Sequence, residues 1–281
     1  MKVGFIDYYL NEYHADHYPE WLREVTGEDI ELYAWAESDP PFPGRLTTKE
    51  WCEIHSADEL SSPEEVCEKA DFIFVLAPDD PEKHFGYAKR VFPFGKPVFV
   101  DKTFATDAGD AMRIISLGER LGTPFFSSSS LRFAPEFAPF AGKAEFVLAC
   151  GGGDRFLIEL IHPIEICACL MGRGAERILT NGDREHLSAM LEYSDGRRAA
   201  INFTLNCRGL DYSAVVCPGG GRQAEALHAR QHFFKAMMKA VADFFADPSS
   251  VPVSHEDTLE GMRIRDGVIR SLGRPGEWTD L

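Results

Sequence analysis

The sequence predicts an α/β protein with a Rossmann-like doubly wound parallel sheet and a C-terminal α+β domain with an open antiparallel sheet. Strand and helix signals alternate over residues 1–130, which is the rhythm of repeated β-α-β units. Over residues 131–281 short strands separated by turns replace that rhythm. The 281 residues suffice for two modest domains. We therefore expect a Rossmann-like dinucleotide-binding-type domain at 1–130 and an α+β substrate or oligomerisation domain at 131–281.

The first half contains short apolar runs that predict buried strands. The run FIFVL is apolar throughout, as is typical of a parallel strand that is covered on both faces. The helix that precedes this FIFVL run would be capped by a serine at 61 or 62. The predicted strands are 3–6, 30–36, 72–76, GKPVFV (95–100) and TPFFSSS (123–129). The predicted helices are 18–25, 63–70, 81–91 and 106–121.

The second half has a different pattern, in which apolar alternation and turn residues indicate antiparallel pairing. Ser194-Asp195-Gly196 is a typical turn between two such strands. The predicted strands are 146–150, 189–193, 199–205 and 212–217. The predicted helices are 156–171, 233–245 and 258–272.

Composition excludes several classes of partner. A formal net charge of −16 argues against nucleic acid and anionic membranes, which are both polyanions. No stretch approaches the roughly 20 apolar residues of a membrane span, and the first predicted strand leaves no room for a signal peptide. Seven scattered cysteines without framework spacing indicate a reduced, cytoplasmic setting.

Five short motifs occur in order along nearly the whole chain. They are Leu76-Ala77-Pro78-Asp79 with His84, GKPVFVDKT (95–103), RFAP (132–135), IHPIE (161–165) and VSHED (253–257). Together they resemble the "TPN…H", "GKHVxxEKP", "RRFxP", "GxHxxD" and "VSxED" motifs of the Gfo/Idh/MocA family, the glucose–fructose oxidoreductase and inositol dehydrogenase group. The resemblance implies a nicotinamide cofactor and oxidation of a sugar or polyol hydroxyl.

The resemblance also implies roles for individual residues. Lys102 would contact the reacting hydroxyl and the cofactor, and His162 would be the acid/base for the hydroxyl proton. Glu165, three residues further along the helix, could share the face of His162 and orient it. Arg132 would bind a substrate anion or pair with an acidic neighbour.

The positions that the resemblance implies for NAD binding are Ile6, Asp7, Tyr8, Tyr9, Glu37, Ala77, Pro78, Asp79, His84 and Asp101. Glu37 ends the second strand, where an acidic residue bonds the ribose hydroxyls, and it would favour NAD over NADP. A solvated loop glutamate is the alternative. His84 would cover a ligand or only cap its helix.

The main departure from the family lies after the first strand, where its three glycines align with Asp7, Tyr9 and Glu12. A tyrosine Cβ blocks the close backbone approach that the middle glycine permits. Two carboxylates beside a pyrophosphate would each cost about 1–4 kcal/mol by Coulomb repulsion. The rings of Tyr8 and Tyr9 would instead fill the groove.

A second group of departures concerns the catalytic residues. Ile158 stands where the family has an aspartate four residues before His162. Glu159 is adjacent, but one residue is about 100° around a helix. Thr103 replaces a proline, and Asp101 replaces a glutamate.

Three hypotheses follow. The first is an NAD-dependent oxidoreductase acting on a sugar-like or polyol hydroxyl or its ketone. The second is a cofactor-free descendant that binds a small polar ligand or a protein partner. The third, more remote, is a metal-dependent lyase or hydrolase using His14, Asp16 and His17, because histidines three apart on a helix can share a metal. A homo-oligomer is expected by analogy with the family.

Overall fold

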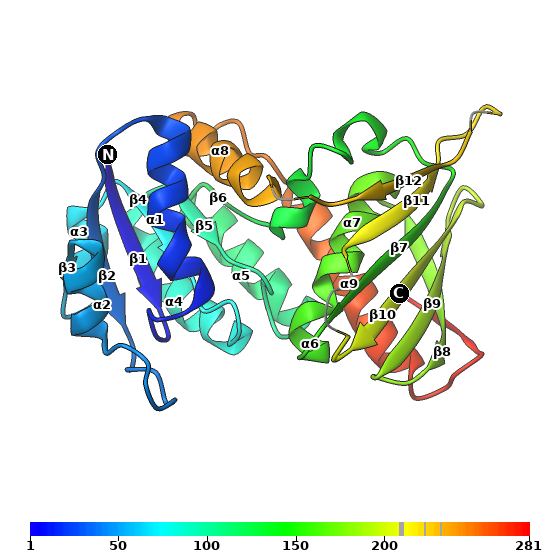
Figure 1. Cartoon of the computed structure of the whole chain (residues 1–281), viewed down its shortest axis with the longest axis horizontal. Coiled ribbons are helices and arrows are strands. Elements are labelled where there is room, and N and C mark those ends of the chain that lie inside the picture. Colours follow the sequence, from blue (N-terminus) through cyan, green and yellow to red (C-terminus); the bar gives the residue numbers. More distant parts are fainter. Residues whose placement is uncertain (208–210, 222, 231) are drawn as a thin grey trace. The chain divides into compact units, whose positions relative to one another are not determined.

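The computed structural model divides into two compact units (Figure 1). The first comprises Met1–Ser128 and Met237–Ser254, and the second comprises Ser129–Ala236 and His255–Leu281. The structure describes residues 1–207, 211–221, 223–230 and 232–281.

The first unit is built on sheet A, a six-stranded parallel sheet with the order β3-β2-β1-β4-β5-β6. Its strands are β1 (Lys2–Asp7), β2 (Glu31–Ala36), β3 (Ala57–Glu59), β4 (Phe72–Val75), β5 (Val98–Val100) and β6 (Phe125–Ser127). Its helical segments are α1 (Tyr13–Thr26), α2 (Thr48–His55), α3 (Pro63–Lys69), η1 (Pro81–Lys83), α4 (His84–Val91), η2 (Phe92–Phe94), α5 (Ala108–Leu121) and most of α8 (Phe233–Ala246). The strand order reverses between β1 and β4, and this switch point is where open α/β sheets bind ligands.

One face of sheet A carries a row of phenylalanines. Phe5, Phe74, Phe99 and Phe126 are register partners on neighbouring strands β1, β4, β5 and β6. All four are at most 1% exposed, and adjacent rings have centroids 5.2–5.7 Å apart. Helix α1 covers the row through Tyr18, whose ring lies 5.8 Å from Phe74.

The other face of sheet A packs so closely on its helices that two positions require glycine. A Cβ on Gly4 would come within 2.4 Å of a Val66 methyl of α3. A Cβ on Gly118 of α5 would come within 2.3 Å of the Phe125 ring. The parallel sheet is therefore covered on both faces, as its apolar strands predicted.

The segment Met237–Ser254 belongs to the first unit, whereas the sequence assigned all of 131–281 to the second domain. The reason is aromatic packing by α8. Phe245 stacks on Phe72 at 4.8 Å and meets Phe74 at 5.3 Å, and Phe244 meets Phe126 at 5.1 Å. Sequence periodicity shows that α8 has an apolar face but not which sheet it covers.

The second unit is built on sheet B, with the order β12-β11-β7-β10-β9-β8-β13. Its strands are β7 (Phe146–Gly153), β8 (Ala175–Gly182), β9 (His186–Tyr193), β10 (Arg198–Leu205), β11 (Ser213–Cys217), β12 (Glu225–His228) and β13 (Trp278–Asp280). Its helical segments are η3 (Ser130–Phe133), η4 (Ala138–Phe140), α6 (Phe156–Glu159), α7 (Ile161–Met171) and α9 (His255–Ser271). Strands β7 and β10 are parallel and the other pairs are antiparallel, so the sheet is mixed but largely antiparallel.

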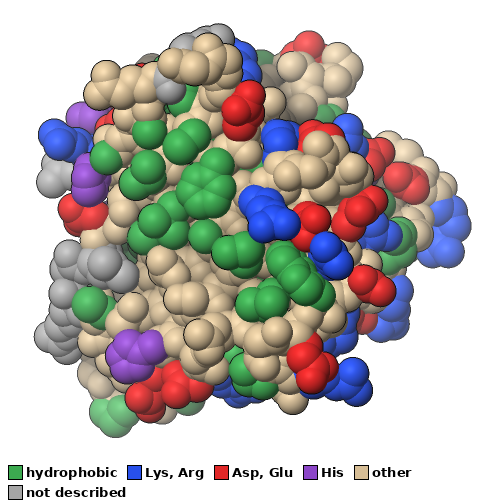
Figure 2. Space-filling model, turned by 90° about the vertical axis from the view of Figure 1, so that its right-hand side faces the viewer, with side chains coloured by type: hydrophobic (Ala, Val, Ile, Leu, Met, Phe, Trp, Pro, Cys, Tyr) green, Lys and Arg blue, Asp and Glu red, His purple; other side chains and the backbone are tan. Residues whose placement is uncertain are grey.

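Sheet B is covered by helices on one face only. Helices α7 and α9 pack on that face, where alternate residues such as Ala149, Ile201 and Leu191 are buried. The other face presents hydrophobic side chains to the surface (Figure 2). Met190 is 39% exposed and Val215 is 38% exposed there. Apolar side chains therefore occur on both faces of sheet B.

The predicted strands and helices are all found, with shifted ends. The predicted helix 156–171 is divided at Leu160 into α6 and α7. Elements α2, β3, β8, β12 and β13 were not predicted. Helix α2 had a usable signal, because Thr47 and Glu50 form a capping box at its start. Among the described residues, no helix has the length and apolarity needed to cross a membrane.

The packing of α8 on sheet A gives a first prediction. Replacing Phe245 with alanine should lower the free energy of unfolding by about 3–5 kcal/mol, because it leaves a cavity against the rings of Phe72 and Phe74. Denaturant unfolding monitored by tryptophan fluorescence measures this loss. The same substitution at Phe42, which is 55% exposed, is the control and should cost far less. Equal losses in the two variants would contradict the assignment of α8 to this core.

Candidate functional site

The switch point of sheet A is occupied by a buried carboxyl group. Asp7 ends β1, and its side chain is 1% exposed. Its Oδ1 accepts from the Tyr8 amide at 2.6 Å and from the Ala77 amide, just after β4, at 2.9 Å. Its Oδ2 is buried without a hydrogen-bond partner. Burial raises the pKa of Asp7 well above its usual value, against the lowering effect of the two amides.

A second carboxyl group, that of Glu12, caps helix α1. Its side chain accepts from the amides of His14, at 2.8 Å, and of Ala15. Glu12 is 7% exposed. Burial, followed by repulsion from Asp7, raises the pKa of Glu12 well above its usual value. Glutamate is an uncommon N-cap, a role that shorter polar residues usually fill.

This arrangement bears directly on a dinucleotide pyrophosphate. In the glycine-rich turn, the amides at the start of the first helix face the phosphates. In this chain the amides of His14 and Ala15 already donate to the Glu12 carboxyl. The residues present therefore do not fit a pyrophosphate as they are arranged in this structure.

The loop between β1 and α1 is held in place by its side chains. The ring of Tyr8 lies beneath the Lys83 ammonium at 4.3 Å, and the ring of Tyr9 lies 5.5 Å from that of Tyr8. The side-chain oxygen of Asn11 accepts from the backbone amide of Leu46 at 2.9 Å, and the side-chain nitrogen of Asn11 donates to the Asp16 carboxylate. These contacts fix the loop backbone around Glu12.

Glu37, the predicted ribose ligand, is paired within the first unit. Its carboxylate contacts Lys83 Nζ at 2.6 Å and accepts from the Tyr87 hydroxyl at 2.7 Å. Burial acts to raise the pKa of Glu37, but these two partners outweigh it and hold the pKa below its usual value. Glu37 is thus ionised at the edge of sheet A, as a ribose ligand would be, but not unpaired.

Lys102 and Asp101 follow β5 at the same edge. Asp101 Oδ2 lies 2.5 Å from His14 Nδ1, and the Tyr18 hydroxyl lies 3.0 Å from that same nitrogen. Burial acts to raise the pKa of Asp101, but His14 and Lys102 hold it below its usual value. The Lys102 Nζ lies 3.9 Å from Asp79, and the Lys102–Thr103 peptide bond is cis.

The side chains of the three residues considered as metal ligands each contact a different partner. His14 pairs with Asp101, Asp16 accepts from the Trp51 indole at 2.8 Å, and His17 Nδ1 contacts the Tyr13 carbonyl at 2.7 Å. Within the described ranges, no group of three or more His, Cys, Asp or Glu side chains could hold a metal ion.

Four of the remaining predicted cofactor positions are buried in the first unit. His84 is fully buried, and its two ring nitrogens lie 2.9 and 2.5 Å from the carbonyls of Phe104 and Leu76. Burial lowers the pKa of His84. Ile6, Ala77 and Pro78 are buried in the sheet edge.

In the second unit, His162 pairs with Glu159. His162 Nε2 lies 3.3 Å from Glu159 Oε2, and Nδ1 lies 2.8 Å from the Ser129 hydroxyl. From the sequence, Glu159 was expected to lie about 100° around the helix from the position of the family's aspartate. Glu159 and His162 are three residues apart, and Leu160 between them has helical dihedral angles, so their side chains share a face and meet.

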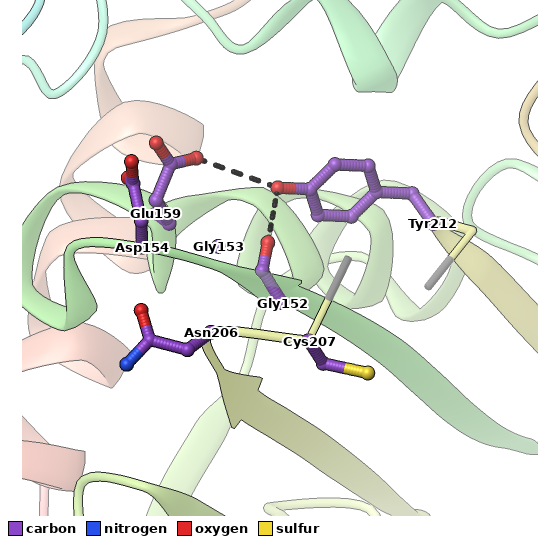
Figure 3. Close-up of a pocket in the computed structure, with 7 residues that line it drawn as sticks. All are labelled: Gly152, Gly153, Asp154, Glu159, Asn206, Cys207 and Tyr212. Carbon is purple, nitrogen blue, oxygen red and sulfur yellow. Dashed lines mark hydrogen bonds between the residues drawn. The ribbon is translucent and has the colours of Figure 1, made fainter. Parts of the chain in front are cut away.

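Glu159 lines a polar cavity of about 460 Å³ (Figure 3). The Tyr212 hydroxyl donates to the Gly152 carbonyl at 2.7 Å and reaches Glu159 at 3.4 Å. Burial and then Glu159 raise the pKa of Tyr212, which keeps this hydroxyl protonated. The other lining residues are Gly153, Asp154, Asn206 and Cys207.

The glycine run in β7 makes room for these side chains. A Cβ on Gly151 would meet the Tyr212 ring at 2.8 Å, and one on Gly153 would meet the Glu159 side chain at 2.3 Å. Both contacts require something to shift. The run Gly151-Gly152-Gly153 was therefore a signal for this site that the sequence analysis did not use.

Arg132 pairs with Glu165, with Nε 2.7 Å from Oε2. Of the two readings of Arg132, this geometry matches the acidic neighbour. Glu165 is accordingly engaged by Arg132, while the ion-pair partner of His162 is Glu159. Burial acts to lower the pKa of Arg132, but Glu165 outweighs it and raises the pKa.

Comparison with solved structures identifies the fold. GenD2 from gentamicin A biosynthesis, solved with NAD, matches with a TM-score of 0.79 at 14% identity, over 100% of this chain and 96% of that one. A myo-inositol dehydrogenase from Corynebacterium glutamicum matches with 0.79 at 14% identity, over 100% and 99%. UDP-N-acetylglucosamine 3-dehydrogenase GnnA from Acidithiobacillus ferrooxidans matches with 0.76 at 12% identity, over 97% of each chain.

These likenesses confirm the two-domain dehydrogenase fold that the resemblance to the Gfo/Idh/MocA family implied. At 12–14% identity they establish the fold alone. No protein-family model and no curated protein sequence matches the chain.

The buried state of Asp7 gives a second prediction. In the unfolded chain Asp7 titrates near pH 4, whereas its native pKa is raised. Between these values the native state binds more protons, so stability falls as pH rises. Asp7→Asn keeps an acceptor for both amides and cannot ionise. Its free energy of unfolding relative to wild type should therefore increase from pH 5 to pH 8, as measured by urea unfolding. Parallel pH curves for the two proteins would contradict the raised pKa.

Proposed function

We propose that this protein is an oxidoreductase that acts on a hydroxyl or ketone group of a small sugar-like or polyol molecule, with NAD as its cofactor. The observation that carries the proposal is the Glu159–His162 pair beside a polar cavity, in a chain that shares its whole fold with dehydrogenases.

The pair supplies acid–base chemistry. A hydroxyl becomes a carbonyl only by losing its proton, and an imidazole titrating near neutrality can accept it. Glu159 would orient the ring of His162 and stabilise its protonated form. For Lys102, at the carboxyl edge of sheet A, we propose contact with the cofactor, as the family resemblance implies.

The lining of the cavity suggests the substrate class. Asp154, Glu159, Asn206 and Tyr212 offer carboxylate, amide and hydroxyl groups. These groups suit the alternating donors and acceptors of a polyol. Two of the described lining residues, Asp154 and Glu159, carry carboxyl groups.

A second candidate function is favoured by one observation. Because Glu12 holds the first amides of α1, the chain could be a cofactor-free descendant that only binds a small polar ligand. The two candidates differ in whether any nicotinamide-dependent turnover occurs.

The proposed role of His162 is testable by kinetics. Turnover would be measured with NAD and a panel of neutral polyols and aldoses, and with NADH and the corresponding ketoses. His162→Ala should lower turnover by about 10²–10⁴-fold, the usual contribution of a general acid/base. Glu159→Gln should lower turnover less and alter its pH profile. His186→Ala, at an exposed histidine of β9 in the same unit, is the control and should behave as wild type.

If His162→Ala and His186→Ala retained equal turnover, the acid/base assignment would be wrong. If neither wild type nor any variant turned over a substrate, while polyols protected the protein against thermal unfolding, the cofactor-free candidate would replace the oxidoreductase.

We further propose that the open face of sheet B joins two copies of this chain, in a reducing, cytoplasmic setting indicated by its scattered free cysteines. The double variant Met190→Glu/Val215→Glu places two charges on that face and should convert an oligomer to a monomer in light scattering. Ile54→Glu, at a residue 64% exposed in the first unit, should leave the oligomer intact. A monomeric wild type would overturn this proposal.

A further inference from the structure

We infer that Glu12 is an internal occupant of the phosphate position at α1, so that a dinucleotide binds this protein only by displacing the Glu12 side chain. This inference rests on the proposed function, because it concerns how the proposed cofactor would reach its site.

The first support is the geometry of the cap. Helix α1 has 14 residues, and the Glu12 carboxyl accepts from the amides of His14 and Ala15 at its start. A phosphate would need the same donors. With Glu12 only 7% exposed, the donors are not shared with solvent. A phosphate and the Glu12 carboxyl are therefore alternatives at one place.

The second support is Asp7. Its Oδ2 is buried without a partner, although nine-tenths or more of buried polar groups have one. Repulsion from Asp7 is, after burial, the main cause that raises the pKa of Glu12. A carboxylate oxygen can only accept hydrogen bonds, and the same holds for a phosphate oxygen, so an ionised Asp7 opposes a phosphate at this cap.

The third support is the loop that carries Glu12. Asn11 bonds the Leu46 amide, and Tyr8 lies beneath Lys83, so the backbone on the N-terminal side of Glu12 is anchored. Rotation of the Glu12 side chain alone would then expose the amides of α1 without refolding the loop.

The consequence is competition within the molecule. A dinucleotide must break the cap and place its phosphates beside Asp7, so wild type should bind weakly. A smaller cap at position 12 should relieve this. Serine is a good N-cap and is too short to fill the space of the glutamate carboxyl. Glu12→Ser should therefore keep α1 capped and tighten binding.

The experiment is a calorimetric titration of wild type, Glu12→Ser and Glu20→Ser with ADP and, separately, with NADH. Glu20 is an exposed glutamate of the same helix, so its variant has the same charge change without touching the cap. We expect Glu12→Ser to lower the Kd for ADP at least 10-fold relative to both other proteins. Thermal unfolding of the unliganded proteins would verify that both variants remain folded.

An unchanged Kd for ADP in a folded Glu12→Ser protein would overturn the inference, whether wild type binds tightly or not at all. The NADH series separates this from the proposed function. Tight NADH binding by wild type with no effect of Glu12→Ser would refute only the internal occupant. A gain for ADP without any binding of NADH would support the occupant and count against the nicotinamide cofactor.

Discussion

The edge of sheet A organises the first unit, because a parallel sheet brings the carboxyl ends of all its strands to one side. Residues far apart in sequence meet there, and their polar groups must be satisfied as they become buried. Asp7 after β1 bonds the Ala77 amide after β4, and Asp101 after β5 bonds His14 of α1. The strand order places the first of these bonds at the switch point between β1 and β4.

At the same edge, the backbone amides at the start of the first helix can be satisfied in two ways. A glycine-rich turn leaves the first amides of the helix to a ligand. In this chain the carboxyl group of Glu12 takes them, and rings from Tyr8 and Tyr9 lie in the loop before it. The fold is retained because sheet A and its phenylalanine row do not depend on what occupies those amides.

The candidate site of the second unit depends on the room that glycines leave beside strand β7. Glycines in β7 let Tyr212 and Glu159 lie against the strand, and Glu159 then reaches His162. The cavity, the acid–base pair and the open face of sheet B all belong to this unit. The proposed substrate cavity and the proposed assembly surface thus belong to a different sheet from the Rossmann-like sheet A.

The sequence by itself indicated the two sheet types and most of the element order, without α2, β3, β8, β12 and β13. Runs such as FIFVL can only be buried strands when helices flank them, and their apolarity is a local property. It also selected Lys102, His162 and Glu37 as candidate site residues by motif and strand end. The tertiary structure decided which contacts form: Glu159 with His162, the α1 amides with Glu12, and sheet A with α8. The three-residue spacing of Glu159 and His162 permits their contact. The docking of α8 depends on packing between segments that lie far apart in the chain, which the apolar period of a helix does not specify.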